Sequence, residues 1–350
     1  MLPSVNIKCY TNREKSCALS VALCEREKPQ FSSYIIYCIA SGTCCHLRRT
    51  VFTRISFEQA GAEPVRGGLE DEDILQEGMR GCSDVFHLAA KGVGWGSYED
   101  YYRVNVEGTE HVLTAARAAT VPRLVYVSTE AVLAGAGPIV NADETLPRTS
   151  HPAGYYGLTK GLAEERVLAA NSSKLTTVVV RPRFVWGNGM SALPQLVQMT
   201  RSGTFRWIDG GRYLTSTCHV ANACEGMLLA AERGCGGETY FLTDGPPIEF
   251  RCFIAMLLQT QGLQPGEQSI PSWLARAVAW SGEWAWRILR LKGEPPLTRE
   301  NVVLIGEEVT VNDARARCEL GYIGKVSREE GLAGMSLIES SLSTLEQAQM

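Results

Sequence analysis

The sequence predicts an α/β protein whose main domain is a doubly wound, parallel β-sheet, followed by a smaller C-terminal domain. From about residue 57 onward, short runs rich in β-branched and apolar residues alternate with segments of helical periodicity. These runs are apolar throughout, which is typical of parallel strands that helices cover on both faces. A chain of 350 residues is also long enough to bury one large core or to form two domains.

Residues 1–56 differ in composition from the rest of the chain. They contain eight Lys and Arg residues, three Glu, no Asp and a single glycine, Gly42. The apolar run at 34–40 predicts one buried strand. We interpret residues 1–56 as an atypical N-terminal segment, such as a degenerate first strand–helix unit; a basic transit peptide is the alternative. Six cysteines lie in this segment without a C-x-x-C pair, so we expect no metal site.

Residues 57–190 carry the strand–helix alternation and are predicted to form the main domain. In such a sheet, ligands bind beyond the carboxyl ends of the strands. Ala89 and Ala90, Ser128 and Thr129, and Pro182 all fall at those ends. The predicted strands are 63–67, 84–90, 124–128 and 175–180, and the predicted helices are 71–79, 98–119 and Tyr156 to about Asn171.

Residues 191–340 form the second, mixed domain. Strands are predicted at 205–211, 240–242 and 309–311, and helices at 220–233 and 273–291. In the last helix, which belongs to a Trp-rich segment at 272–291, one apolar stripe faces a charged side. The stripe contains Trp273, Ala277, Trp280, Trp284, Ile288 and Leu291, and the charged side contains Arg276, Glu283, Arg287 and Arg290. We favour a helix packed on the second domain; a lid over an apolar substrate and a peripheral membrane contact are the alternatives.

Charge and hydropathy exclude two classes of protein. A net charge of −4 gives no electrostatic basis for binding nucleic acid. No segment offers 18 uncharged apolar residues, so no membrane-spanning helix is predicted. Without a cleavable signal peptide, the expected location is the cytoplasm, with membrane association as the variant that the Trp-rich segment suggests.

The motif Tyr156-Gly157-Leu158-Thr159-Lys160 suggests proton-transfer chemistry. Positions i and i+4 lie on the same face of a helix, so an ammonium is held beside a phenol. Lowering a phenol pKa from about 10 to about 7 needs roughly 4 kcal/mol, which a cation about 4 Å away can supply. Ser128 and Thr129, upstream in the sequence, offer hydroxyls that can hold a substrate oxygen. An exposed helical pair without function is the alternative interpretation.

Taken together, several segments in order resemble the extended short-chain dehydrogenase/reductase family, over roughly residues 57–335. The chain is most similar to its 3β-hydroxysteroid dehydrogenase branch, within the NAD-dependent epimerase/dehydratase superfamily. The stretch from Val121 to Thr129 and the Trp-rich helix support this finer placement. The matching segments are 84–90, 105–109, 125–129, 156–160, 181–187 and 218–222.

The resemblance implies a Rossmann-type fold and an NAD(P)-dependent reaction at a CH–OH group, with NAD favoured over NADP. The implied substrate is a 3β-hydroxysteroid or a similar apolar alcohol or ketone, and a homodimer is expected by analogy. Asn105 matches a structural or proton-relay position. The implied catalytic residues are Tyr156, which accepts the hydroxyl proton, Lys160, which lowers its pKa and holds the nicotinamide ribose, and Thr129 with Ser128, which fix the substrate oxygen. The implied cofactor-binding residues are Leu69, Ala89, Ala90, Lys160, Pro182 and Val185.

One part of the family pattern is missing. The family opens with a strand and a Gly-x-x-Gly-x-x-Gly turn that holds the pyrophosphate, but Gly42 stands alone before Gly61. The glycines at 92–96 follow a later strand and suit a substrate loop. Two alternatives therefore remain: a sugar-nucleotide epimerase or dehydratase, and a non-catalytic protein that keeps the fold without the cofactor.

Other polar residues have structural interpretations. His87 is expected to pack in the core, and His219 to cap the helix at 220–233. Glu164 and Glu165 are interpreted as a solvated helical face, with pairing of Glu164 to Lys160 in the absence of cofactor as the alternative. For Arg181 and Arg183, binding of an anion and ion pairing at the strand end are equally favoured.

Overall fold

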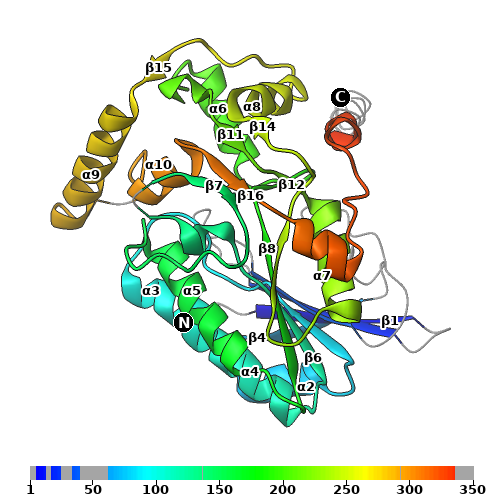
Figure 1. Ribbon diagram of the computed structural model, residues 1–350. Helices are drawn as coiled ribbons and strands as arrows, with labels where there is room; N and C mark the ends of the chain where they lie inside the picture. The colour runs from blue at the N-terminus through cyan, green and yellow to red at the C-terminus, as the bar shows by residue number, and fades with distance from the viewer. Residues whose placement is uncertain are drawn as a thin grey trace, which may run out of the picture.

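The computed structural model describes residues 5–12, 17–24, 34–39, 62–135, 137–291 and 293–335, with the backbone alone for those before Gly67. Its centre is an eight-stranded sheet in the order β13-β8-β6-β5-β3-β2-β1-β4 (Figure 1). The strands are β1 (Val5–Asn12), β2 (Cys17–Cys24), β3 (Tyr34–Ile39), β4 (Ala62–Gly67), β5 (Asp84–His87), β6 (Arg123–Val127), β8 (Thr176–Pro182) and β13 (Thr239–Leu242).

The predicted fold class, an α/β protein with a parallel sheet, is confirmed for the four strands on one side of β3 in the sheet. There β13, β8, β6 and β5 are all parallel to their neighbours. The other half is antiparallel, with β3, β2 and β1 lying between β5 and β4. The strand predicted at 34–40 is present as β3, whereas β1 and β2 were not predicted. The domain boundaries at residues 56 and 190 stay predictions.

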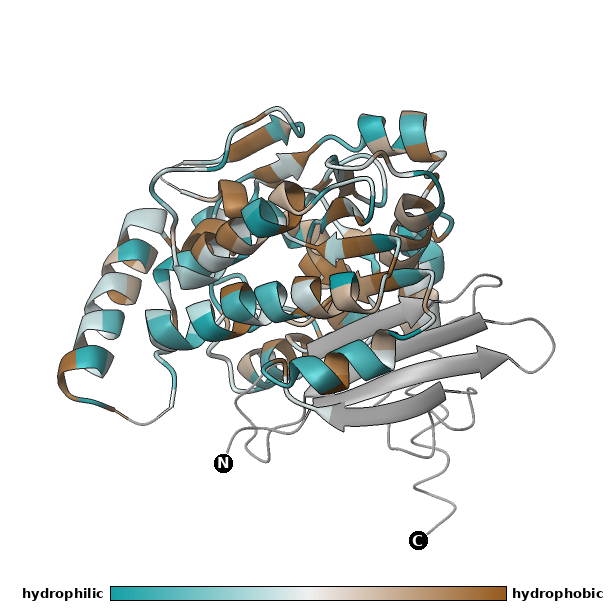
Figure 2. Cartoon of the chain, turned by 90° about the horizontal axis from the view of Figure 1, so that it is seen from below, coloured by the Kyte–Doolittle hydropathy of each residue, from teal (hydrophilic) through white to brown (hydrophobic). Residues whose placement is uncertain are grey.

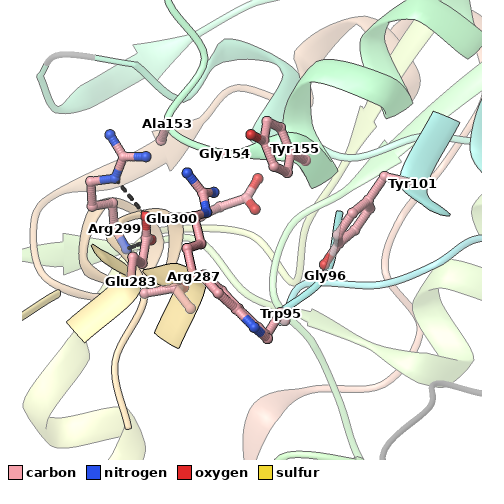
Figure 3. A pocket seen from close by; sticks show the side chains of 12 residues that line it. Trp95, Gly96, Tyr101, Ala153, Gly154, Tyr155, Glu283, Arg287, Arg299 and Glu300 are labelled. Atoms are coloured by element: carbon pink, nitrogen blue, oxygen red, sulfur yellow. Dashed lines mark hydrogen bonds and ion pairs between the residues drawn. The ribbon is translucent and has the colours of Figure 1, made fainter. Parts of the chain in front are cut away.

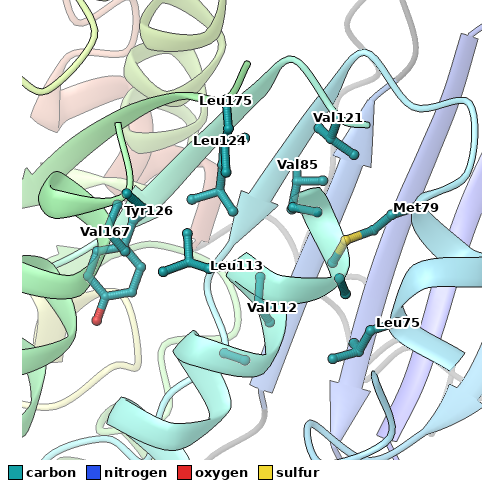
Figure 4. Packing of buried hydrophobic residues seen from close by; sticks show 14 of the residues in the cluster. Leu75, Met79, Val85, Val112, Leu113, Val121, Leu124, Tyr126, Val167 and Leu175 are labelled. Carbon is teal, nitrogen blue, oxygen red and sulfur yellow. The ribbon is translucent and has the colours of Figure 1, made fainter. Parts of the chain in front are cut away.

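Alternate residues of the parallel strands face opposite sides of the sheet, as the strand period of two requires. On one side, Val85, Leu124 and Tyr126 pack against helices α2 (Glu72–Met79), α4 (Gly108–Ala118) and α5 (Tyr155–Ala169) (Figure 4). On the other side, Val125 and Val178 pack against α7 (Val220–Arg233). The sheet is therefore covered on both faces, which explains the unbroken apolar runs of its strands.

The helix predicted at 98–119 is present in three parts. It consists of α3 (Tyr98–Tyr102), a π-helical turn (Arg103–Glu107) and α4. The π-turn places Asn105 in the interior, 1% exposed. Such turns are frequent at functional sites.

The C-terminal part of the chain builds smaller sheets above the carboxyl ends of the parallel strands (Figure 1). A four-stranded sheet has the order β14-β11-β16-β7, so β7 returns from the first half of the chain to pair with β16. The predicted strand at 205–211 is shorter than expected, because residues 209–211 form a 3-10 turn. The elements are β7 (Ile139–Ala142), β9 (Val185–Trp186), α6 (Leu193–Arg201), β10 (Trp207–Ile208), β11 (Leu214–Thr215), β12 (Cys218–His219), β14 (Ile248–Glu249), α8 (Phe250–Gln259), β15 (Ser269–Ile270), α9 (Ser272–Ile288), α10 (Arg299–Ile305) and β16 (Val309–Val311).

The predicted Trp-rich helix is present as α9 and packs on the C-terminal part of the chain, as favoured, but not through its apolar stripe. Trp273, Trp280 and Trp284 are 68%, 58% and 59% exposed. The helix packs instead through Ala275 and Ala279, whose small side chains let it approach the neighbouring apolar cluster closely. Glu283, predicted on the outward charged side, is buried and pairs with Arg299 at 2.8 Å. Among the described residues, no helix has the length and hydropathy to cross a membrane.

Candidate active site

The site lies where the parallel strands end below the C-terminal sheets. Tyr156 is in the first turn of α5, and Thr129 follows β6. The Thr129 hydroxyl donates to Glu130 Oε2 at 2.9 Å and accepts from the Ala131 amide at 3.2 Å. The Thr129 side chain is also close enough to Tyr156 to act on the pKa of its phenol. The structure therefore brings together these two of the four predicted catalytic residues.

A buried ion pair that the sequence did not indicate supports Thr129. Glu130 Oε1 accepts from Arg183 at 2.8 Å, and the two residues are 4% and 3% exposed. Arg183 also donates to the Leu304 carbonyl at 2.8 Å, so the pair ties the end of β6 to the C-terminal part of the chain. Of the two roles considered for Arg183, the ion pair is the one observed.

The pKa of Tyr156 differs in direction from the prediction. Burial raises the pKa of the Tyr156 phenol, and the negative charges of Glu130 and Glu300 raise it further. The nearby Thr129 hydroxyl acts in the opposite direction but does not compensate. The phenol is therefore protonated at neutral pH, which is the form in which it can give a proton.

Lys160 lies on α5 like Tyr156, but its ammonium contacts residues of β6. Its Nζ donates to the Val127 carbonyl at 2.7 Å and lies 4.0 Å from the centroid of the Tyr126 ring. Burial lowers the pKa of Lys160 to about 7, although the nearby Glu164 carboxylate raises it. The charges that shift the pKa of Tyr156 are those of Glu130 and Glu300, not that of Lys160. The predicted lowering of the Tyr156 pKa by Lys160 is therefore wrong for this arrangement.

Ser128 is directed away from Thr129, into a second buried ion pair. Its hydroxyl donates to Glu164 Oε2 at 2.6 Å, and the same oxygen accepts from Arg181 Nε at 3.0 Å. Glu164 is 1% exposed, so its interpretation as part of a solvated face is wrong, whereas its neighbour Glu165 has a half-exposed side chain. The ion pair considered for Arg181 is the role observed.

Two further residues have the structural roles proposed for them. His87 is fully buried, its Nε2 lies 2.9 Å from Thr109 Oγ1, and burial lowers its pKa to about 3. His219 accepts from the Ala221 amide at the start of α7.

Asn105 binds the backbone of Lys91 through both ends of its amide and donates to Thr159 Oγ1 at 2.9 Å. It therefore ties the loop after β5 to α5.

Glu300 is a site residue that no local motif indicated. Helix α5 begins after Gly154, which has no side chain to cap the first backbone amides. The Glu300 carboxylate, from α10, takes this role by accepting from the Gly157 amide at 2.7 Å and the Tyr156 amide at 3.4 Å. A Cβ at Gly154 would lie 2.3 Å from Glu300 Oε2, so the cap depends on this glycine. Burial raises the pKa of Glu300 to about 7.

This pKa predicts that the protein loses stability as the pH rises through neutrality. Between pH 4.5 and about 7, folded Glu300 retains a proton that the unfolded chain releases, so the free energy of unfolding falls across that window and levels off above it. Relative to Glu300→Gln, which does not titrate, the wild-type protein is expected to lose about 2–3 kcal/mol between pH 5 and pH 8. Urea unfolding at both pH values measures this difference. Glu165→Gln, on the exposed side of α5, is the control and should follow the wild type; a Glu300→Gln profile parallel to the wild type would contradict the assignment.

A pocket opens beside the start of α5 (Figure 3). Trp95 and its flanking glycines border it, and the substrate role expected for the loop at 92–96 stays a prediction. Its volume is about 40 Å³, which is room for one or two water molecules. The predicted catalytic and cofactor residues do not line it. Its walls are Gly94, Trp95, Gly96, Tyr101, Ala153, Gly154, Tyr155, Glu283, Arg287, Thr298, Arg299 and Glu300.

The predicted cofactor residues differ in their suitability. Ala89 and Pro182 lie at the ends of β5 and β8, and Lys160 has three N–H donors, of which the bond to Val127 uses one. These residues fit the nicotinamide-ribose end of a dinucleotide. Leu69 instead packs in the core, where a Cβ on Gly108 would lie 2.8 Å from it. Ala90 is partly buried after β5, and Val185 is 42% exposed in β9. The predicted absence of a pyrophosphate turn concerns residues outside the described ranges.

Comparisons with known proteins agree with this arrangement. Residues 49–272 match the model of the 3-beta hydroxysteroid dehydrogenase/isomerase family. The chain is 54% identical over 273 residues, 78% of its length, to the 4-hydroxy-2-methyl-3-oxo-4-farnesyl-3,4-dihydroquinoline-1-oxide ketoreductase of Stigmatella aurantiaca, covering 82% of that protein. It is 37% identical over 281 residues to the 2-alkyl-3-oxoalkanoate reductase of Stenotrophomonas maltophilia, covering 78% of this chain and 85% of the reductase.

Solved structures share the fold. One described as gox2253 has a TM-score of 0.65 and 28% identity, with 82% of this chain and 86% of the other covered. MoeE5 in complex with UDP-glucuronic acid and NAD has a TM-score of 0.59 and 25% identity, with 79% and 85% covered. The family match, the related reductases and the doubly wound sheet together show that this chain belongs to the 3-beta hydroxysteroid dehydrogenase/isomerase family of NAD(P)-dependent oxidoreductases.

Proposed function

We propose that the protein is a ketoreductase that uses NAD(P)H to reduce a ring ketone in a large apolar molecule to a secondary alcohol. The observation that carries this proposal is the 54% identity, over most of both chains, to a ketoreductase whose substrate has a farnesyl chain on a 3-oxo ring. The 2-alkyl-3-oxoalkanoate reductase also acts on an oxo group in a molecule with alkyl chains. Reduction is therefore the favoured direction.

The protonation state of Tyr156 supports this direction. Reduction adds a hydride to the carbonyl carbon and a proton to its oxygen, and the bound nicotinamide cofactor supplies the hydride. In the proposed reaction, Tyr156 Oη gives its proton to the carbonyl oxygen, a step for which a phenol with a raised pKa is ready at neutral pH. The Thr129 side chain lies next to the phenol, and its hydroxyl would turn from Glu130 toward the substrate oxygen to hold it.

Lys160 and Glu300 complete the proposed site. Lys160 lies one helical turn from Tyr156 and has a pKa of about 7, so an ammonium that can bind ribose hydroxyls is present near neutral pH. The bonds of Glu300 to the Tyr156 and Gly157 amides fix the helix turn from which the phenol projects. Ser128, engaged with Glu164, is proposed to act through this buried pair rather than on the substrate.

Oxidation of a 3β-hydroxysteroid is the second candidate. It is favoured by the 30% identity over 295 residues to the sterol-4-alpha-carboxylate 3-dehydrogenase, decarboxylating, of Dictyostelium discoideum. The sugar-nucleotide alternative is less favoured, because the MoeE5 enzyme bound to UDP-glucuronic acid is only 25% identical. The alternative of a non-catalytic protein makes a different prediction, since it requires that the cofactor does not bind.

We expect the purified protein to bind NADH or NADPH in isothermal titration calorimetry and to consume it when a farnesylated 3-oxo-dihydroquinoline N-oxide or a 2-alkyl-3-oxoalkanoate is added. Loss of absorbance of the reduced cofactor measures the reaction, and a mixture without ketone is the control. Formation of reduced cofactor from NAD⁺ and a 3β-hydroxysteroid, with no reduction of either ketone, would favour the steroid candidate. Absence of binding for both cofactors would refute both enzymatic readings.

A further inference from the structure

We propose that Arg287 binds an anionic oxygen group of the substrate, such as a carboxylate, in the pocket beside α5. This inference rests on the proposed function, because it names the class of ketone that the reductase would prefer. Helix α9, which carries Arg287, stands at one edge of the molecule (Figures 1 and 2). The Arg287 side chain is exposed and lines the pocket (Figure 3).

Two aromatic rings hold the guanidinium of Arg287. It lies 5.3 Å from the ring centroid of Trp95 and 5.5 Å from that of Tyr155, within the range of cation–π contacts. The Tyr155 ring is itself packed edge-on against Tyr98, with the centroids 5.7 Å apart. Contacts with aromatic rings do not use the N–H donors of a guanidinium, and these donors match the two oxygens of a carboxylate. Among the residues that the structure describes, none accepts a hydrogen bond from these donors.

The acidic side chains that line the pocket already have other partners. Glu283 accepts from the backbone amide and the Nε of Arg299, each at 2.8 Å. Glu300 accepts from two backbone amides at the start of α5, and burial raises its pKa to about 7, so it is partly protonated at neutral pH. Within the described ranges no acidic side chain forms an ion pair with Arg287, including the exposed Glu294 beside the loop at 92–96. The pocket walls therefore carry no net negative charge, and Arg287 is left to pair with an anion from outside the protein.

The size and position of the pocket suit a substituent of the substrate rather than its ketone. The volume of about 40 Å³ has room for one or two water molecules, which is also the space that the oxygens of a carboxylate need. Tyr156 and Thr129 do not line the pocket, whereas Tyr155, the neighbour of Tyr156 in the chain, does. A group bound here is therefore not the carbonyl that Tyr156 protonates. Arg287 would determine which ketone binds and would not take part in the chemical step.

A ketone that carries a carboxylate and the neutral ester of the same ketone test this role. With reduced cofactor, kcat/KM for a 2-alkyl-3-oxoalkanoate should exceed that for its methyl ester at least about tenfold, because only the acid offers a charged acceptor. Arg287→Gln should raise KM for the acid at least about tenfold with little change in kcat, and it should leave kcat/KM for the ester within about twofold. Arg287→Lys keeps the charge without the bidentate geometry, so its KM for the acid should lie between the two.

The matched control is Arg290→Gln, because Arg290 follows α9, is exposed and does not line the pocket. This variant should keep the wild-type preference for the acid. A wild-type protein that reduces acid and ester equally well would overturn the proposal, as would an Arg287→Gln variant that loses activity equally on both. Calorimetry with NADPH excludes the phosphates of the cofactor as the anion: its Kd should be the same for wild type and Arg287→Gln, and a weaker Kd in the variant would assign Arg287 to the cofactor instead.

A ligand without a ketone separates this inference from the proposed function. In calorimetry with NADPH present, a 2-alkylalkanoate should bind the wild-type protein at least about tenfold more tightly than its methyl ester, and Arg287→Gln should abolish the difference. If this difference is found in a protein that reduces no ketone, the proposed reaction fails and the anion site stands. If ketones are reduced but the alkanoate and its ester bind equally, the anion site fails and the proposed reaction stands.

Discussion

Replacing Tyr156 by Phe is expected to lower the rate of ketone reduction about a thousandfold while the protein remains folded. The phenylalanine ring keeps the packing of Tyr156 against the cluster around Ala131 and Val132. It removes the hydroxyl that lies near Thr129 and that would protonate the substrate oxygen. Loss of general acid catalysis typically costs about 10²–10⁴ in rate. Because the hydroxyl acts mainly in the transition state, kcat should fall much more than KM rises.

Steady-state kinetics with a reducible ketone measure this effect, and circular dichroism establishes that the variant is folded. Tyr102→Phe provides the matched control, because Tyr102 lies in α3 and does not line the pocket. It should keep a rate within about twofold of the wild type. Turnover of Tyr156→Phe at a rate close to that of the wild type would refute Tyr156 as the proton donor, whatever the substrate.

Replacing Glu164 by Ala is expected to lower the free energy of unfolding by about 3–5 kcal/mol. The substitution leaves the Arg181 guanidinium, which is 4% exposed, without its carboxylate, and it also removes the acceptor of the Ser128 hydroxyl. An unpaired buried charge is among the most destabilising changes that one substitution can make. Loss of the Glu164 charge would also lower the Lys160 pKa further, since that charge raises it.

The next residue in the sequence supplies the control. Glu165 pairs with Arg148 on the surface, and its side chain is 48% exposed. Glu165→Ala should therefore cost no more than about 1 kcal/mol. Urea unfolding measures the free energy of unfolding of both variants. Equal losses of this free energy in Glu164→Ala and Glu165→Ala would mean that Glu164 is not the partner that neutralises Arg181. A double variant, Glu164→Leu with Arg181→Met, should recover part of the loss because no charge remains buried.

The two glutamates also show how far the sequence could predict the site. Helix α5, Tyr156 and Lys160 followed from periodicity and spacing, which are local properties of the chain. The difference between Glu164 and Glu165 did not, because it depends on Arg181 in β8 and on which side of α5 meets the sheet. The same limit explains α9: its amphipathic stripe was visible, but two alanines rather than the tryptophans turned out to meet the protein.

Contacts between segments that are distant in the sequence account for the remaining differences between the predicted and the observed site. Glu300 could not be assigned, since its backbone partners lie in a helix that a different part of the chain forms. The direction of the Tyr156 pKa shift could not be predicted from the sequence either. It depends on burial and on the charges of Glu130 and Glu300 rather than on the Tyr156–Lys160 spacing. The parallel strands were predictable because their apolar runs report burial on both faces.

The capping of α5 by Glu300 has a consequence for the order in which the site is completed during synthesis. Tyr156 leaves the ribosome 144 residues before the carboxylate that accepts from its amide. A nascent chain can therefore form the sheet and the helix while the first turn of that helix still lacks its acceptor. The phenol would gain its final setting only after residue 300 has been translated, so a chain that ends before Glu300 would lack this support for the chemistry.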